Sequence, residues 1–240
     1  MPAGLDGNTN PIATPQREQV LTRVCHEIIS RRMAGTPLLV GIDGIDGSGK
    51  STFADELASR LLDLEVPVVR STVDSFHNPR SARWSKGKSS PAGFYLDSHD
   101  FATLRELLLD PMRAGLGATY RVAAFDEPSD QPVVAPPETV SGDEVLLFDG
   151  IFLCRPELLA YWDFIVFLEA KTRVDLDRLG YVMAEAPPGG TDLVHHVLRW
   201  VERIDRYSSG MRYYLDTEDP RSRANIVIDN NDFGRPAIDL

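Results

Sequence analysis

Short apolar runs alternate with amphipathic stretches along most of this chain. The apolar runs are bounded by polar residues or glycine, as buried strands are: residues 37–43, 66–73, 144–148, 164–168 and 226–228. Apolar residues spaced three and four apart predict helices at residues 15–35, 52–62, 101–110 and 194–204. We expect the helix that begins at Phe101 to stop at Asp110–Pro111, because proline lacks a backbone donor. The alternation predicts βα units and a parallel α/β sheet that helices cover on both faces.

Three segments interrupt this alternation. Residues 1–13 carry Gly, Asn and Pro without periodicity, and we expect a flexible tail before a single domain over residues 14–240. Residues 80–93 place Arg and Lys among Ser, Gly and Pro, which predicts a mobile basic loop. Residues 115–142 contain two short extended stretches around the turn-rich segment 126–130, which predicts a hairpin-like excursion.

The charge balance narrows the class of protein. The 240 residues carry 25 Lys and Arg against 36 Asp and Glu, a net charge of −11. This charge repels a phosphate backbone and an anionic membrane, so we expect neither as a partner. The pattern predicts no particular oligomeric state.

Cysteine usage and the chain start favour a cytoplasmic protein. The two cysteines, Cys25 and Cys154, are too few for a disulfide framework or a Cys-based zinc site. The first ten residues lack the regions of a secretory signal, and no apolar run reaches the roughly 18 residues of a membrane span. We therefore expect a chain that is neither secreted nor inserted.

A glycine-rich loop joins the first predicted strand to the following helix. Residues 44–51 match the G-x-x-x-x-G-K-[ST] pattern at every fixed position, with the strand and helix context that it requires. In such a loop, backbone N–H groups and the helix N-terminus bind phosphate, the lysine adds charge, and the Ser hydroxyl binds Mg2+. The candidates for nucleotide binding are Gly44, Gly47, Ser48, Gly49, Lys50, Ser51 and Thr52. We expect Asp46 to turn its carboxylate away from the phosphates.

Two carboxylates follow other predicted strands at the same sheet edge. Asp149 ends an apolar strand and can hold the metal ion, or it is a turn residue at the strand end. Asp74 follows residues 66–73 and can take the proton of an acceptor hydroxyl, or it caps a turn or helix. No lysine follows an asparagine, so the N-K-x-D guanine motif of GTPases is absent.

Together these motifs resemble the uridine kinase and phosphoribulokinase group of P-loop kinases, particularly bacterial uridine kinase-like proteins. The matching segments are residues 44–52, 73–77, 97–101, 120, 147–151, 203–207 and 224–230. The resemblance implies a P-loop kinase fold with a five-stranded parallel sheet between helices. It also implies ATP as the donor, Mg2+ as the metal, a lid near residues 171–206 and an excursion over the acceptor site.

The resemblance also implies roles for individual residues. Asp74 is the expected base and Lys50 acts on the transferring phosphate, while Ser51 and Asp149 hold the metal. The expected acceptor residues are His77, Asp97 for the ribose hydroxyls, Tyr120 and Phe125. The expected lid residues at the ATP phosphates are Arg178, Arg203 and Arg206; helical spacing alone equally allows the last two to pair with surface acids.

The chain departs from the family pattern at three places. Phe125 stands where the nucleoside kinases carry a base-reading His, Asp149 stands where they carry Glu, and Val182–Met183 replaces an Arg-Asp pair. We expect an ATP-dependent kinase that phosphorylates a hydroxyl of a small molecule, with the 5′-hydroxyl of a uridine- or cytidine-like nucleoside as the first choice. The alternatives are another small acceptor, such as pantothenate, nicotinamide riboside or a sugar, and a regulatory P-loop NTPase with a macromolecular partner.

Overall fold

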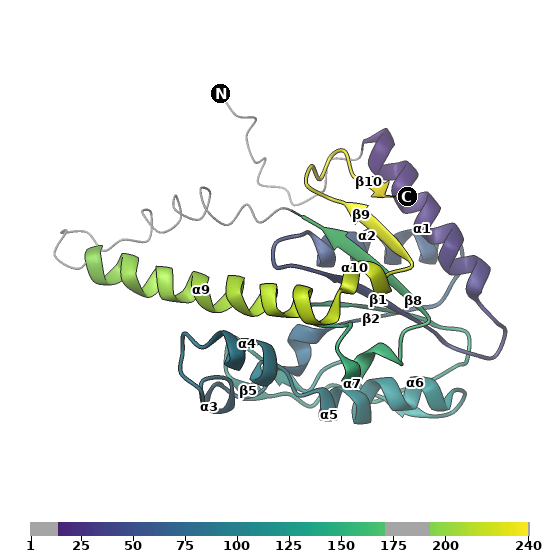
Figure 1. Ribbon diagram of the computed structural model, residues 1–240. Helices are drawn as coiled ribbons and strands as arrows, with labels where there is room; N and C mark the ends of the chain where they lie inside the picture. Colours follow the sequence, from purple (N-terminus) through teal and green to yellow (C-terminus); the bar gives the residue numbers. More distant parts are fainter. Residues whose placement is uncertain (1–13, 171–192, 240) are drawn as a thin grey trace.

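A six-stranded, mostly parallel sheet forms the centre of the molecule (Figure 1). The computed structural model describes residues 14–170 and 193–239, with side chains from Asp205 onward in the helix that begins at Leu193. The strands lie in the order β10-β9-β8-β1-β7-β2. Their bounds are β1 (Leu38–Gly44), β2 (Val68–Thr72), β7 (Val145–Gly150), β8 (Phe164–Glu169), β9 (Ile226–Asp229) and β10 (Ala237–Asp239).

The parallel part of the sheet confirms the predicted five strands. Strands β2, β7, β1, β8 and β9 pair in parallel, and β10 adds an antiparallel edge that the sequence did not predict. Because β10 has only three residues, it shows no measurable hydrophobic period. Strand β1 lies between β7 and β8, so the loop that follows it emerges at the middle of the sheet edge.

Helices cover both faces of the sheet (Figure 1). Their bounds are α1 (Pro15–Arg31), α2 (Lys50–Asp63), α3 (Arg80–Arg83), α4 (Pro91–Asp97), α5 (Phe101–Leu104), α6 (Asp110–Ala114), α7 (Pro156–Leu159), α9 (Leu193–Glu218) and α10 (Pro220–Arg223), with a 3-10 turn η1 (Val73–Phe76) and a π-helical turn η2 (Arg105–Leu109). Helix α1 is capped by Thr14, whose side chain accepts a hydrogen bond from the backbone of Arg17. It ends at Arg31 rather than at Gly35, because Arg32 turns to extended backbone.

Successive strand side chains enter two different cores. Val40 and Ile42 of β1 pack with α1 and α2, whereas Leu39 packs with the helices of the opposite face. Tyr214 of α9 and Phe148 of β7 belong to that second core. With both faces buried, the carboxyl edge of the parallel strands is the place where polar side chains can gather.

The helix from Phe101 does not stop at Pro111, which corrects the prediction. It continues through η2 into α6. Pro111 has no N–H for the carbonyl of Leu107, four residues earlier, and that carbonyl accepts a hydrogen bond from Arg121 at 2.8 Å instead. A contact that is distant in the sequence therefore satisfies the group that the proline leaves open.

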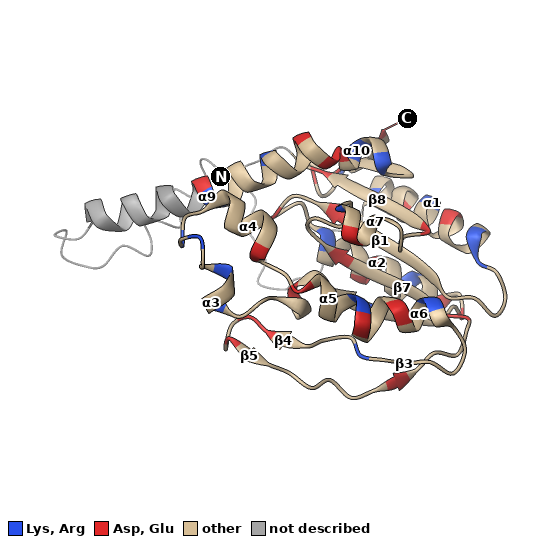
Figure 2. Cartoon of the chain, turned by 60° about the horizontal axis from the view of Figure 1, so that its bottom comes forward, with Lys and Arg blue, Asp and Glu red and all other residues tan. Residues whose placement is uncertain are grey.

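The expected basic loop at residues 80–93 is partly helical, since it contains α3 and the start of α4. Its Lys and Arg residues, blue in Figure 2, lie in α3 and in the segment that leads to α4. Arg83 is buried, with an ion pair to Glu127 at 2.5 Å and a longer one to Asp130 at 3.3 Å. These pairs join the basic segment to the excursion.

The excursion consists of two antiparallel pairs, in agreement with the hairpin-like expectation. Strand β3 (Thr119–Tyr120) pairs with β6 (Glu138–Thr139), and β4 (Phe125–Asp126) pairs with β5 (Gln131–Pro132). The expected tail, residues 1–13, and residues 171–192 of the expected lid lie outside the described residues.

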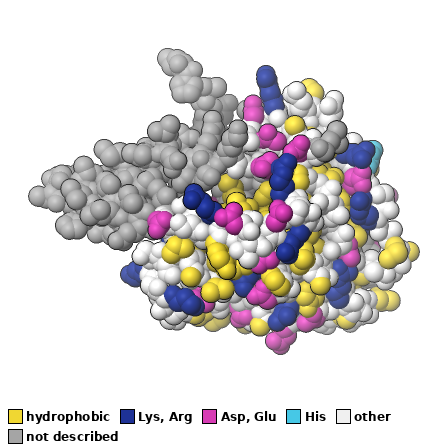
Figure 3. Space-filling model, in the orientation of Figure 1, with side chains coloured by type: hydrophobic (Ala, Val, Ile, Leu, Met, Phe, Trp, Pro, Cys, Tyr) yellow, Lys and Arg dark blue, Asp and Glu magenta, His cyan; other side chains and the backbone are white. Residues whose placement is uncertain are grey.

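Charged side chains and helix composition can be described for part of the molecule. Where the face in Figure 3 is coloured, Lys and Arg side chains are interspersed with Asp and Glu. In the part of the chain that the structure describes, no helix combines the length and the apolar character needed to cross a bilayer.

Candidate active site

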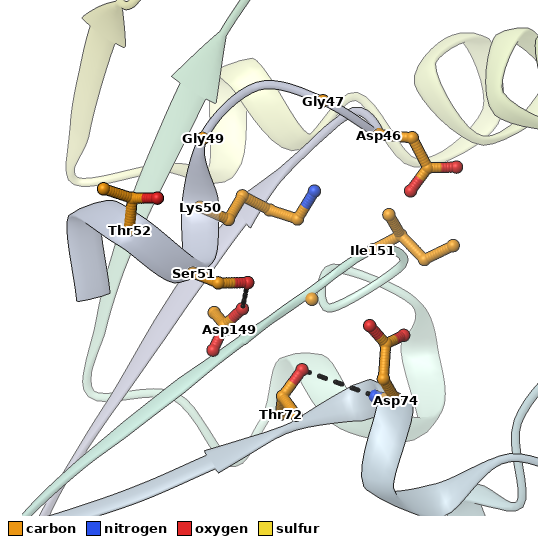
Figure 4. A pocket seen from close by; sticks show the side chains of 11 residues that line it. Asp46, Gly47, Gly49, Lys50, Ser51, Thr52, Thr72, Asp74, Asp149 and Ile151 are labelled. Atoms are coloured by element: carbon orange, nitrogen blue, oxygen red, sulfur yellow. Dashed lines mark hydrogen bonds between the residues drawn. The ribbon is translucent and has the colours of Figure 1, made fainter. Parts of the chain in front are cut away.

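A pocket of about 300 Å³ opens at the carboxyl edge of the sheet (Figure 4). Three elements build it: the glycine loop between β1 and α2, the end of β7, and the turn η1 after β2. The lining residues are Asp46, Gly47, Gly49, Lys50, Ser51, Thr52, Thr72, Asp74, Asp149, Gly150 and Ile151. The structure thus brings the predicted phosphate loop and both predicted carboxylates to one pocket.

Two glycines of the loop occupy positions that other residues would strain. Gly49 has a φ of 84° where it caps the N-terminus of α2. At Gly44, a Cβ atom would lie 2.5 Å from the carbonyl oxygen of Leu168. The loop conformation therefore depends on glycine at both ends.

A buried bridge that the sequence analysis missed holds the loop from behind. The Asn230 amide donates a hydrogen bond to the Ser48 carbonyl at 2.7 Å. Arg17 of α1 donates to the Asn230 side chain at 3.5 Å and forms an ion pair with Glu56 at 2.7 Å. Asn230 ended a segment that resembled the family, which was a usable signal, whereas Arg17 looked like an ordinary polar helix residue.

A second buried contact lies beneath the loop. Asp43, the last residue but one of β1, is fully buried and accepts hydrogen bonds from the Gly44 N–H at 2.7 Å and from the Tyr214 hydroxyl. Burial raises the pKa of Asp43 to about 6, although the bonds from Tyr214 and Gly44 oppose this. The Tyr214 oxygen also accepts the Cys154 N–H at 2.9 Å. This network, which the sequence did not reveal, ties α9 to the base of the loop.

Lys50 and Ser51 lie at the N-terminus of α2, as predicted. The Lys50 ammonium donates to the Ile45 carbonyl at 2.7 Å within the loop. Ser48 is fully buried and does not line the pocket, and its hydroxyl has no hydrogen-bond partner among the described residues. The pocket does present a lysine and a helix N-terminus, and both are groups that bind a phosphate.

The two predicted metal ligands contact each other. The Ser51 hydroxyl donates to Asp149 at 2.7 Å, and Asp149 is 1% exposed. Hydroxyl and carboxylate oxygens are ligands that Mg2+ prefers, so these residues fit the ion that the resemblance implies. Arg70, which the sequence analysis missed, lies 2.9 Å from Asp149 and also pairs with Asp55. A basic residue inside a strand carried no signal of this contact.

Asp74 faces the phosphate loop across the pocket (Figure 4). The cap of η1 is Thr72, whose hydroxyl accepts the Asp74 N–H at 3.4 Å, so the Asp74 carboxylate is not needed as a cap. Although Asp74 is open to the pocket, partial desolvation raises its pKa, and the negative charges of Asp46 and Asp149 add to the rise. Geometry and environment both suit a proton acceptor.

Asp46 corrects one expectation. Its carboxylate lines the pocket instead of turning away (Figure 4), and it is exposed. Its side chain therefore remains hydrated, which lowers the cost of a negative charge near a phosphate site.

Two of the expected acceptor residues lie beside Asp74. His77 approaches the Asp74 carbonyl with Nδ1 at 2.9 Å. Asp97 ends α4 next to this segment, since its carbonyl accepts a hydrogen bond from Asn78 at 3.0 Å. The Asp97 carboxylate forms an ion pair with Lys86 of the basic segment.

The other two expected acceptor residues are buried. Phe125 lies near η1, because the N–H of the preceding Ala124 donates to the Ser75 carbonyl at 2.9 Å. Tyr120 is directed elsewhere: its hydroxyl donates to Glu138 at 3.1 Å within the β3–β6 pair. The structure therefore gathers His77, Asp97 and Phe125 around η1 and leaves Tyr120 at the excursion.

Arg206 does not reach the phosphate loop, which corrects its expected role. Its buried guanidinium donates to backbone carbonyls at 3.2 to 3.3 Å, those of Arg83, Gly87, Lys88 and Ser90. Arg206 therefore anchors the basic segment to α9, and its donors are already engaged. Arg178 and the side chain of Arg203 lie outside the described residues.

A parallel sheet whose central strand leads into this loop, with a Ser–Asp pair and a facing carboxylate, defines a P-loop kinase. A sequence profile of the Phosphoribulokinase / Uridine kinase family matches residues 39–179. The chain belongs to this family, which confirms the resemblance and the ATP-dependent kinase class that it implies.

Individual relatives agree with the family. A uridine kinase-like protein of Arabidopsis thaliana is 24% identical over 86% of this chain, and the chain spans 42% of that protein's length. Uridine-cytidine kinase B of Dictyostelium discoideum is 25% identical, with 80% of this chain and 77% of that protein covered. The structure of a possible uridine kinase from Bacillus stearothermophilus superimposes with a TM-score of 0.67 at 25% identity and covers 88% of this chain and 97% of that one.

Proposed function

We propose that this protein transfers the terminal phosphate of ATP to a hydroxyl group of a small molecule. In this reaction the acceptor oxygen forms a bond to the phosphorus, the bond to the leaving ADP oxygen breaks, and the acceptor proton passes to a base. The observation that carries the proposal is the Asp74 carboxylate, which faces Lys50 and Ser51 from the opposite wall of the pocket (Figure 4).

The loop residues account for the donor half of the reaction. The helix N-terminus and Lys50 would bind the phosphates of ATP and stabilise the charge that develops during transfer. Ser51 and Asp149 would hold Mg2+, which neutralises phosphate charge when it is bound. Arg178 and Arg203 are proposed as further phosphate contacts, and Arg206 is not.

The acceptor half of the proposal is a nucleoside or a similar ribosyl compound. Its support is the uridine kinase name of the relatives, together with His77 and Asp97 beside Asp74. The Asp97 carboxylate forms a partly exposed ion pair with Lys86 in this structure. A ribose diol that binds to Asp97 would therefore have to displace the Lys86 ammonium. Phe125 offers an apolar ring and no hydrogen bond to a base.

The substitution Asp74→Asn tests the catalytic part. It keeps the side-chain size but removes the proton acceptor, so turnover should fall about 100- to 10,000-fold with ATP affinity nearly unchanged. The matched control Asp46→Asn removes the same charge from the phosphate side of the pocket, and it should change ATP affinity more than turnover. Full activity of Asp74→Asn would show that another residue is the base.

A screen for acceptors tests the substrate part. Nucleosides, pantothenate, nicotinamide riboside and sugars are incubated with Mg-ATP, and ADP is measured together with the phosphorylated product. We expect a nucleoside to stimulate ADP release with equal formation of nucleoside monophosphate. Stimulation by a macromolecule without any phosphorylated small molecule would favour a regulatory NTPase instead.

A further inference from the structure

Three potential metal ligands meet on the acceptor side of the pocket. One ligand atom from each of Asp74, His77 and His99 lies within 4.8 Å of the other two. An antiparallel backbone bridge holds His77 beside His99, and their rings lie 4.5 Å apart between centroids. The sequence analysis included residues 97–101 among the segments that resemble the family, but it gave His99 itself no role.

The hydrogen bond of His77 fixes which ring nitrogen is available. Its Nδ1 atom lies 2.9 Å from the Asp74 carbonyl, and a carbonyl can only accept, so Nδ1 carries the proton. The lone pair of the neutral ring is then on Nε2. Metal-binding histidines characteristically donate their other N–H to a carbonyl or carboxylate in this way.

His99 supplies an independent observation. It is 6% exposed, and its buried Nε2 atom has no hydrogen-bond partner among the described residues. Its ring is stacked on Phe101 and meets the edge of Phe152, which holds its orientation. Burial lowers the pKa of His99 well below its usual value, so the ring is neutral and able to coordinate. A buried nitrogen without a hydrogen-bond partner is unfavourable unless a bound ligand interacts with it.

The chemistry of the donors selects the kind of ion. Two imidazole nitrogens and one carboxylate suit zinc and its neighbours, whereas Mg2+ prefers oxygen ligands. The ligand atoms of a tetrahedral zinc ion lie about 3.3 Å apart. The three ligand atoms here, which lie within 4.8 Å of one another, have to move closer together to bind zinc, and rotation of the exposed Asp74 side chain allows this. Asp46 and Asp149 add negative charge near Asp74, and Arg83 and Arg155 act in the opposite direction near His99.

We propose that Asp74, His77 and His99 form a binding site for a divalent transition metal of the zinc class, and that the bound ion inhibits phosphoryl transfer. A coordinated Asp74 carboxylate cannot accept the acceptor proton, and the ion occupies the space beside the acceptor hydroxyl. The inhibition rests on the proposed role of Asp74 as the base, whereas the metal binding does not.

Metal binding is measured on the full-length protein without nucleotide, after treatment with a chelator. Zn2+ is titrated against a chromophoric indicator, and Co2+ is followed by its visible absorption. We expect one site in the wild type, and affinity about 100-fold lower in His77→Ala and in His99→Phe, which keeps the aromatic stack. The melting temperatures of the metal-free variants are measured to check that each variant is folded. If His99→Phe does not fold, the test rests on His77→Ala, because His77 is only half-buried.

Two control variants locate the site. His26→Ala removes an exposed histidine of α1, and Asp149→Asn removes the carboxylate of the proposed magnesium site. His26→Ala should retain the zinc affinity of the wild type, and Asp149→Asn, which changes only a nearby charge, should lower it far less than His77→Ala does. Absence of zinc binding in the wild type, or equal affinity in His77→Ala and His99→Phe, would overturn the proposed site.

The inhibition is measured separately, with buffered free Zn2+ and excess Mg-ATP, as phosphorylated product formed. Wild-type turnover should fall as the site fills, and His77→Ala should need about 100-fold more zinc for the same fractional loss relative to its own metal-free rate. Zinc bound at the cluster with unaltered turnover would refute the inhibition and leave the site itself standing. A failure of the kinase proposal is seen independently, in the activity of Asp74→Asn.

Discussion

Replacing Tyr214 with Phe tests the buried connection between α9 and the phosphate loop. The ring remains and only the hydroxyl is lost, so the packing against Phe152 and Tyr95 is retained. The hydroxyl donates to Asp43 and accepts the Cys154 N–H, and both of these groups are buried. The substitution therefore leaves one acceptor and one donor without a partner.

The expected loss of stability follows from these two groups. Each unsatisfied buried polar group costs about 1–3 kcal/mol, so Tyr214→Phe should lower the free energy of unfolding by about 2–6 kcal/mol. At about 2–4 °C per kcal/mol for a chain of this size, the melting temperature should fall by about 4–24 °C. Loss of the Tyr214 hydrogen bond should also raise the pKa of Asp43 further, because that bond favours the charged form.

Urea unfolding at neutral pH measures the change, and the neighbouring tyrosine provides the control. Tyr213 is 55% exposed on the same helix, so Tyr213→Phe should stay within about 0.5 kcal/mol of the wild type. If Tyr214→Phe also stayed within that limit, the network would carry no net stability and the connection between α9 and the loop would lose its support.

Three further expectations concern the loop and the metal pair. Lys50→Ala should reduce turnover at least about 100-fold in a steady-state assay while the circular dichroism spectrum is retained, because the lysine acts on the transferring phosphate; retention of more than about a tenth of the rate would contradict this role. Asp149→Asn should raise the Mg2+ concentration needed for half-maximal activity more than the acceptor concentration, whereas Asp55→Asn, which removes the other partner of Arg70, should not. The pKa of Asp43 is about 6 in the folded state, above its unfolded value of 3.8, so between these pH values the folded state binds more protons than the unfolded state. The free energy of unfolding of the wild type should therefore fall by about 3 kcal/mol as the pH rises from about 4 to 6. Asp43→Asn should lack this loss, so a difference in unfolding free energy between the two proteins that does not change with pH would rule out the titration of Asp43.

The features that the sequence predicted are local ones. The five parallel strands follow from apolar runs that must be buried on both faces, and the hairpin-like excursion follows from its turn residues. The phosphate loop is fixed by eight consecutive residues between a strand and a helix, so its geometry needs little from the rest of the chain. Asp74 and Asp149 were predicted at one edge because the carboxyl ends of parallel strands meet there.

The features that only the tertiary structure decided depend on partners far apart in the chain. Tyr214 lies 171 residues from Asp43, and Asn230 lies 182 residues from Ser48, yet each pair shares a hydrogen bond. No periodicity records such a contact, because a hydrogen bond depends on where packing places its two groups. Arg206 shows the same limit: its helical spacing allowed a phosphate contact, and the carbonyls packed around its guanidinium gave it a structural role.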